Sequence, residues 1–267
     1  MTALTQIRIV AAPCPQGEDR ALFFSFGQPY EQAKSQCGNI APHIVLARPQ
    51  ALPAGSVLYS ADGVPLFQVT GRVLTDLQTV PTPLLRALRP FLQVEEFTAT
   101  ISKVTLSLAC ITLSDKGYAG EREDRSGPTI AEMLRGALDI GLVRHCLLPD
   151  DPQALKALVL ELASGQGFDL IVTCGGTGLS PRDLSPEALL PILDRRLPGM
   201  EQAMIMASLR KTPHAMLARL LAGTIGPSLV LALPGSVKAV LENLEAILPA
   251  LPHALDKLRG QNSDCGG

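Results

Sequence analysis

Residues 168–178 read FDLIVTCGGTG, an apolar run that stops abruptly at two glycines. A continuous apolar run of this kind is typical of a strand buried on both faces, as in a parallel sheet. Glycine lacks a Cβ, so backbone amides after the strand can approach a ligand closely and can adopt positive φ. Successive exposed amides form an anion-binding concavity. The segment predicts a buried parallel strand that ends at an anion site, with a plain glycine turn as the alternative.

Further strand and helix patterns alternate around this run. Strand patterns cover residues 104–113, 142–148, 168–174 and 228–233, and helical patterns cover 129–138, 152–163, 186–195, 200–209, 237–247 and 251–259. Strands separated by helices imply right-handed crossovers between parallel strands. The sequence predicts an α/β fold with three α/β/α layers around a mostly parallel sheet. Ligands of such sheets bind outside the carboxyl ends of the strands.

The first part of the chain has a different pattern of short strands between proline and glycine residues. The expected strands are Ile7–Ala11, Leu22–Phe26, Ile44–Ala47, Ser56–Ser60 and Leu66–Thr70. Asp62-Gly63 predicts a hairpin turn between the last two, and Thr82–Leu92 is interpreted as a short helix. We expect a small mostly-β domain over 1–98, a boundary near Thr98–Ser102, an α/β domain over 103–259 and a flexible tail over 260–267.

Composition and motifs exclude several classes of function. The 267 residues are 46% hydrophobic and 18% charged with a net charge of -2, so neither nucleic acid nor a membrane is expected as a partner. The first ten residues lack a signal peptide pattern, and the cytoplasm is the expected location. The six cysteines form no C-x-x-C pair, which argues against zinc. The P-loop and dinucleotide-binding glycine patterns are also absent.

The glycine loop continues to an acidic residue, Asp183. Ser185 and Pro186 are suited to the start of the next helix, so Asp183 is not needed as its cap. Thr177 adds a hydroxyl donor to the loop. We interpret 175–178 as a phosphate-binding loop and Asp183 as a ligand or magnesium-binding residue.

A second acidic loop follows the strand pattern 142–148. Asp151 is expected to cap the next helix, whereas Asp150 has no evident local partner. A carboxylate beside phosphates is repelled unless a cation lies between them, and Mg²⁺ binds carboxylates together with phosphate oxygens. Asp150 is therefore predicted to bind a metal, with a solvated turn residue as the alternative.

Two more loops follow strand patterns and are expected at the same edge. Ser114 and Asp115 offer a hydroxyl and a carboxylate to a nucleotide, and 234–236 offers a close backbone approach and a helix amino end. The charged stretch Glu121–Arg125 is interpreted as a solvated, mobile loop, and Ser126 as the cap of the helix that follows it.

These loops carry a family resemblance over residues 103–259. The matching residues are Leu113-Ser114-Asp115, Asp124 to Pro128, Pro149-Asp150-Asp151, Gly175 to Asp183, Ser185 to Ala188, Pro198-Gly199, Ser208-Leu209, Thr212-Pro213, Ala215 to Leu217, Arg219 and Pro234-Gly235. In order and spacing they resemble the molybdopterin adenylyltransferase family, which includes the G domain of gephyrin. The resemblance implies a homotrimer that uses Mg²⁺ with ATP as co-substrate and molybdopterin as acceptor. It also implies contacts with other molybdenum cofactor assembly proteins.

The resemblance also implies residue roles. Asp150 and Asp183 match the essential acids, with Asp150 on the metal. The molybdopterin-binding positions are Gly175, Gly176, Thr177, Gly178 and Ser208, and the nucleotide-binding positions are Ser114, Asp115, Pro234, Gly235 and Ser236. The chain departs from the family pattern at Ala218, where relatives often have serine, and at Gln202 and Ile205, where they often have glutamate and arginine. A molybdopterin carrier without catalysis is the alternative function, and molybdenum and tungsten are both open as the eventual metal.

Parts of the first domain resemble a MOSC domain, the small β-barrel of molybdenum cofactor sulfurases. The matching segments are Cys37 to Ile40, Leu52 to Leu58 and Leu66 to Gly71. The resemblance implies a reduced or non-catalytic barrel that binds cofactor or a partner. We interpret Cys14 and Cys37 as buried or incidental cysteines, with sulfur handling as the alternative. The terminal Gly266-Gly267 is interpreted as part of a disordered tail.

Overall fold

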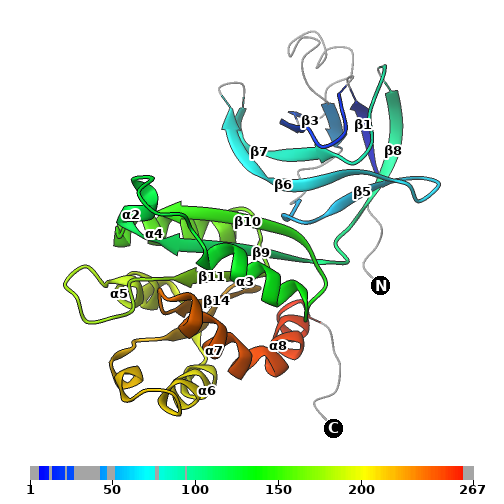
Figure 1. Ribbon diagram of the computed structural model, residues 1–267. Coiled ribbons are helices and arrows are strands. Elements are labelled where there is room, and N and C mark those ends of the chain that lie inside the picture. Colours follow the sequence, from blue (N-terminus) through cyan, green and yellow to red (C-terminus); the bar gives the residue numbers. More distant parts are fainter. Residues whose placement is uncertain are drawn as a thin grey trace. The chain divides into compact units, whose positions relative to one another are not determined.

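The computed structural model describes residues 6–11, 14–21, 23–26, 43–46, 52–75, 78–93 and 95–260. The chain divides into two compact units, Met1–Thr105 and Leu106–Gly267 (Figure 1). The boundary expected at Thr98–Ser102 falls inside a strand of the first unit, Glu95–Ser102, so the structure moves it to Thr105 and Leu106. Cys37–Ile40 and residues 261–267 lie outside the described residues.

The first unit contains an eight-stranded sheet in the order β2-β7-β6-β5-β8-β1-β4-β3. The strands are β1 Gln6–Ala11, β2 Asp19–Ala21, β3 Phe23–Phe26, β4 His43–Leu46, β5 Val57–Ser60, β6 Pro65–Thr75, β7 Gln78–Ala87 and β8 Glu95–Ser102. Adjacent strands are antiparallel, except for β3 and β4. The hairpin expected at Asp62-Gly63 joins β5 to β6, where Gly63 has a φ of 79°.

The helix predicted at Thr82–Leu92 is wrong. Residues up to Ala87 belong to β7, which pairs with β6. Leu85 and Ala87 are buried whereas Leu84 and Arg86 are half-buried, and this alternation is the two-residue period of a strand. Phe91, beyond the strand, stacks on Phe67 with ring centroids 4.8 Å apart in the core of this unit.

The second unit is built on a six-stranded sheet in the order β10-β9-β11-β14-β13-β12. The strands are β9 Leu106–Leu113, β10 Ile140–Leu148, β11 Leu170–Cys174, β12 Arg195–Arg196, β13 Leu221–Ile225 and β14 Ser228–Leu233. The first four strands in this order are parallel, as predicted, and the last two are antiparallel additions. The carboxyl ends of β9, β10, β11 and β14 therefore share one edge.

Helices cover both faces of this sheet, so the predicted three-layer α/β/α fold is confirmed (Figure 1). The helices are α2 Asp115–Tyr118, α3 Ser126–Arg135, α4 Pro152–Leu160, α5 Ser185–Leu189, α6 Pro198–Leu209, α7 Val237–Ile247 and α8 Leu251–Leu258. Alternate strand residues such as Leu108 and Val172 pack with α3, α6, α7 and α8 in one core, and α4 lies on the other face.

Helix ends follow local chemistry, with two corrections to the sequence predictions. Asp151 caps α4 as expected, because its carboxylate accepts from the amides of Gln153 and Ala154 at 2.8 and 3.2 Å. Ser126 does not cap α3 but is its first residue. The helix expected over 186–195 ends at Leu189, because Pro191 cannot donate to an α-helical hydrogen bond.

Among the described residues, no helix has the length and apolar character needed to cross a membrane.

Candidate active site

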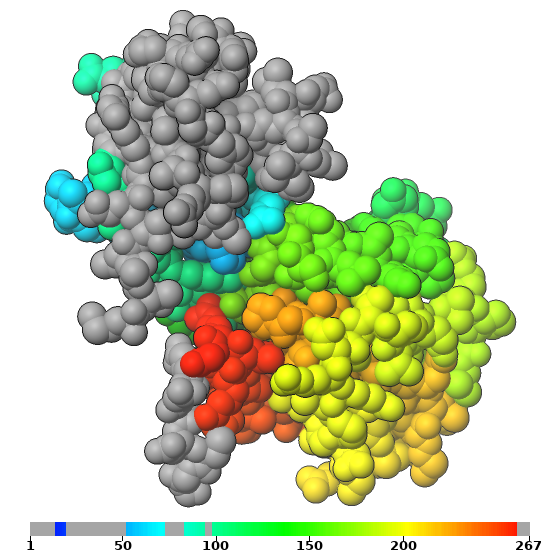
Figure 2. All heavy atoms as spheres, turned by 180° about the vertical axis from the view of Figure 1, so that it is seen from behind, coloured from blue at the N-terminus to red at the C-terminus, as the bar shows by residue number. Residues whose placement is uncertain are grey.

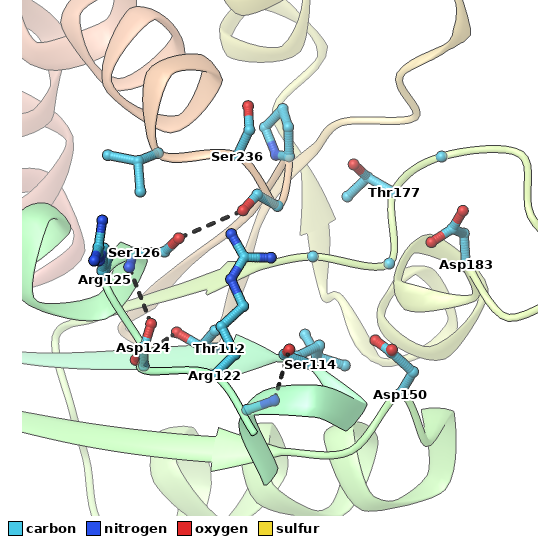
Figure 3. A pocket seen from close by; sticks show the side chains of 18 of the residues that line it. Thr112, Ser114, Arg122, Asp124, Arg125, Ser126, Asp150, Thr177, Asp183 and Ser236 are labelled. Atoms are coloured by element: carbon cyan, nitrogen blue, oxygen red, sulfur yellow. Dashed lines mark hydrogen bonds between the residues drawn. The ribbon is translucent and has the colours of Figure 1, made fainter. Parts of the chain in front are cut away.

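A cavity of about 810 Å³ opens at the edge where the four parallel strands end (Figure 3). It is lined by Thr112, Leu113, Ser114, Gly117, Arg122, Glu123, Asp124, Arg125, Ser126, Leu147, Asp150, Gly175, Gly176, Thr177, Gly178, Asp183, His214, Leu217, Ala218, Pro234, Gly235, Ser236 and Val237. The loops after β9, β10, β11 and β14 all contribute, as expected for an open α/β sheet.

The glycine loop is a bare backbone surface of this cavity. Gly175 and Gly176 have φ values of 108° and 66°, in the left-handed region that favours glycine. A Cβ on Gly175 would lie 2.6 Å from the carbonyl oxygen of Leu113, so the loop packs tightly against the end of β9. Ser185 does not cap α5 from outside as expected; it is the first helical residue, and its hydroxyl donates to the carbonyl of Gly175 at 2.8 Å.

Arg219 braces the same loop from the opposite side. Its amide donates to the carbonyl of Thr177 and its Nε donates to the carbonyl of Gly178, both at 3.0 Å. Its Nη2 donates to the carbonyl of Asp183, and its Nη1 pairs with Glu187 of α5. One guanidinium therefore spans the loop from its glycine end to its acidic end.

Asp183 lines the cavity together with this loop. Its Oδ2 accepts from the amide of Ser180 at 2.9 Å, which closes the turn between them. A Cβ on Gly178 would lie 2.8 Å from the same oxygen. The absence of that Cβ lets the carboxylate of Asp183 approach the glycine backbone closely.

Asp150 lines the same cavity, so the structure brings the two predicted acids together (Figure 3). Its amide donates to Oδ1 of Asp115 at 3.0 Å. Burial, reinforced by the negative charge of Asp115, raises the pKa of the Asp150 carboxyl above its usual value. A cation would be stabilised at such a carboxylate.

Asp115 has a different position from the one expected of a nucleotide ligand. It is not among the lining residues; its Oδ1 accepts from Asp150 and its Oδ2 pairs with Arg182. Asp115 thus connects the loop after β10 to the loop that carries Asp183. Ser114 does line the cavity, and its Oγ accepts from the amide of Gly117 at 3.1 Å.

The loop after β14 forms the wall opposite α2. A Cβ on Gly235 would lie 3.4 Å from the Cα of Gly175, so the two glycine-containing loops are close neighbours. Ser236 caps α7, because its Oγ accepts from the amide of Ala239 at 3.3 Å. Pro234, Gly235 and Ser236 all line the cavity, and their contact with a nucleotide stays a prediction.

The charged stretch before α3 lines the cavity, whereas the sequence interpretation placed it in a solvated loop. Arg122, Asp124 and Arg125 line the cavity. Oδ1 of Asp124 accepts from the amides of Ser126 and Gly127 at 3.0 and 3.1 Å, and Oδ2 accepts from Thr112 at 3.0 Å. Asp124 is therefore the acid that satisfies the start of α3. An acidic residue two positions before Ser126-Gly127 was the available signal.

Ser208 is not brought to this cavity. It lies in α6, where its hydroxyl is buried and donates to Oδ1 of Asn243 in α7 at 3.3 Å. Gln202 and Ile205 line a separate groove of about 570 Å³, and Ala218 lines both cavities. Ala218, where relatives often have serine, therefore lines the cavity without offering a hydroxyl group.

The cavity offers neither a thiolate nucleophile at Cys174 nor, among the described residues, a complete set of protein ligands for a metal ion. Burial raises the pKa of the Cys174 thiol, below the glycine loop, to about 11, so it is protonated at neutral pH and is not a thiolate nucleophile. Within the described part of the chain, no group of three or more His, Cys, Asp or Glu side chains is placed to hold a metal ion. A cation at Asp150 and Asp183 would need further ligand atoms from a substrate.

Known proteins are similar to the second unit. Residues 109–253 match a family described as "Probable molybdopterin binding domain". Gephyrin of Dictyostelium discoideum is 40% identical over 154 residues, which are 54% of this chain but only 21% of that protein. A molybdopterin adenylyltransferase of Helicobacter pylori J99 is 36% identical over 157 residues, covering 58% of this chain and 89% of the relative.

Solved structures match over the same part of the chain. The molybdopterin biosynthesis enzyme MoaB from Thermus thermophilus is 46% identical with a TM-score of 0.54, over 58% of this chain and 97% of that one. These matches lie in the second unit and do not test the MOSC-like prediction for the first. With a family match over more than half of its residues, this chain belongs to the molybdopterin-binding domain family.

Proposed function

We propose that the second unit is a molybdopterin adenylyltransferase of molybdenum cofactor biosynthesis, which uses Mg²⁺ and ATP to form adenylyl-molybdopterin and pyrophosphate. The observation that carries the proposal is the meeting of Asp150, Asp183 and the bare glycine loop in one cavity. The relatives named molybdopterin adenylyltransferase support it. Because the reaction consumes ATP, we place it in the cytoplasm.

The residues of the cavity have simple roles in this reaction. An oxygen of the pterin phosphate attacks the α-phosphorus of ATP in line, and the bond from that phosphorus to the β-phosphate oxygen breaks. The electron pair leaves with pyrophosphate. The protein mainly positions charged groups. The amides of 175–178 would hold the acceptor phosphate, while Ser114 and 234–236 would face the nucleotide.

The two acids fit a magnesium ion that arrives with ATP. Mg²⁺ in phosphoryl-transfer sites is held by one or two carboxylates together with substrate phosphates, and Asp150 and Asp183 provide two. Asp150 is half-buried beside Asp115, and burial together with that negative charge raises the pKa of its carboxyl. Mg²⁺ bound there would offset negative charge on the triphosphate.

Pyrophosphate release tests the proposal. The purified chain, given molybdopterin and MgATP, should release pyrophosphate in proportion to the adenylylated product. Asp183→Asn removes a charge at nearly constant volume and should lower the rate at least about 100-fold, as expected when a charged transition-state contact is lost. Pterin binding, followed by fluorescence, should change little.

The carrier hypothesis predicts a different result in the same assay. A carrier would bind the pterin and release no pyrophosphate, in the wild type as in the variant. Asp139→Asn, an exposed acid outside the cavity, is the control for loss of one carboxylate and should match the wild type.

We further propose that the second unit assembles with copies of itself as a homotrimer. The groove of about 570 Å³ is flanked by Leu190 and Met206, whose side chains are 47% and 57% exposed. The segment around residue 200, which carries Met206, is visible at the surface in Figure 2 (yellow). Exposed apolar side chains beside a groove support a protein interface.

A further inference from the structure

Charged side chains on the cavity wall mostly form hydrogen bonds or ion pairs with other groups of the protein. Asp124 accepts from Ser126, Gly127 and Thr112. Arg125 lies 3.9 Å from Glu123, and both side chains are strongly exposed. The side chain of Arg122 forms no hydrogen bond or ion pair with the described residues, and it is the cationic side chain on the cavity wall of which this is true.

The backbone before Arg122 explains why this side chain faces the cavity. The amides of Glu121 and Arg122 both donate to the carbonyl of Lys116, at 2.8 and 3.2 Å. Gly120, with a φ of 76°, makes the turn that allows this return onto α2. Figure 3 shows the guanidinium of Arg122 extending into the cavity, with Ser114 between it and Asp150 in this view.

One magnesium ion does not balance the negative charge that the two acids and both substrates bring together. MgATP and a pterin phosphate together bring a large negative charge beside Asp150 and Asp183. Negative charge also accumulates on pyrophosphate as it leaves. An unpaired guanidinium is suited to this group, because its planar donors bind phosphate oxygens in pairs.

We propose that Arg122 binds the β- and γ-phosphates of the nucleotide and stabilises pyrophosphate as it leaves. This inference rests on the proposed adenylyl transfer. It assigns the acceptor phosphate to the glycine loop and the leaving phosphates to the loop before α3. Arg122 then distinguishes ATP from AMP, because AMP lacks the phosphates that it contacts.

Binding measurements on the full chain separate this role from a general loss of charge. Arg122→Ala should weaken binding of MgATP and of pyrophosphate with MgCl₂ by about tenfold to 100-fold, the range for charged hydrogen bonds. AMP binding should stay within about twofold. Arg122→Lys keeps the charge but loses paired donation, and it should fall between the wild type and Arg122→Ala.

Arg135→Ala is the matched control, since Arg135 is an exposed arginine at the end of α3 and does not line the cavity. Calorimetry should give wild-type affinities for it. The inference is overturned if Arg122→Ala weakens AMP and ATP equally, or weakens neither. A wild type that binds pyrophosphate and ATP but does not transfer AMP to molybdopterin would instead contradict the proposed function.

Discussion

At the scale of single residues, the site depends on how each charge is compensated. Asp124 is fully used by the start of α3 and by Thr112, whereas Asp150 is left beside Asp115. Both facts follow from loop geometry, and burial beside Asp115 raises the pKa of the Asp150 carboxyl. In the proposed reaction Mg²⁺ compensates the charge of Asp150, and the site is therefore expected to respond to pH.

The pH dependence of the reaction should report Asp150. Because its pKa is raised, the carboxyl remains protonated to a higher pH than an ordinary aspartate, and a protonated carboxyl binds Mg²⁺ poorly. At limiting Mg²⁺, the rate of pyrophosphate release should fall about tenfold per pH unit below that pKa. Saturating Mg²⁺ should move the acidic limb to lower pH, and an acidic limb that ignores Mg²⁺ would contradict this assignment.

Through Asp150, a rise in pH should lower the free energy of unfolding, whereas it should raise the reaction rate. A raised folded-state pKa means that the folded chain binds the proton more tightly, so stability falls as pH rises from the unfolded value through the folded one. In EDTA at neutral pH, Asp150→Asn should therefore have a slightly higher Tm than the wild type. With ATP present, the wild type should gain Tm from Mg²⁺ and the variant should gain less.

At the scale of elements, parallel strands bring the loops together and Arg219 holds one of them in place. The contacts of Arg219 with the carbonyls of Thr177, Gly178 and Asp183 span the loop between β11 and α5. Its neighbour Ala218 lines the cavity, so this segment connects two walls of the site. Arg219 acts as a positioning residue in this arrangement.

Replacing Arg219 should misplace Asp183 without unfolding the unit. The lysine of Arg219→Lys cannot donate to the carbonyls of both Gly178 and Asp183, which the guanidinium of Arg219 contacts. We therefore expect kcat for pyrophosphate release to fall about tenfold or more, while KM for ATP changes less. Glu187→Gln, which removes the exposed partner of Arg219, should cost little, since such pairs are worth about 0–1 kcal/mol. Equal losses in both variants would argue for the ion pair instead.

At the scale of the whole molecule, the two units have separate cores. Phe67 and Leu85 belong to the core of the first, and Leu108 and Leu231 belong to the core of the second. The described residues that line the cavity belong to the second unit.

The proposed trimer should have three times the 28.3 kDa mass of one chain in light scattering after size exclusion. Met206→Glu places a charge on the exposed apolar face and should shift the protein to monomers, with far-UV circular dichroism unchanged. Leu92→Glu is the control, because Leu92 is 88% exposed in the first unit. A wild type that elutes as a monomer would contradict the trimer.

Local patterns were sufficient for most of the second unit. The apolar runs that became β9, β11 and β14 are buried on both faces, so their composition alone indicates parallel strands. The short edge strand β12 and its neighbour β13 were not predicted, because two or five residues beside a turn resemble many loops. In the first unit, alternation in β7 was mistaken for a helix, since its apolar residues fit both periods over so short a run.

The sequence by itself indicated that residues 175–178 follow a buried strand and that neither Asp150 nor Asp183 is required as a helix cap. It could do so because caps, turns and strand ends are set by neighbours in the chain. Only the tertiary structure decided that Asp115 supports Asp150, that Ser208 packs against Asn243, and that Arg122 faces the cavity. These assignments depend on contacts between segments 35 residues apart, or on the direction of a loop, which no local pattern specifies.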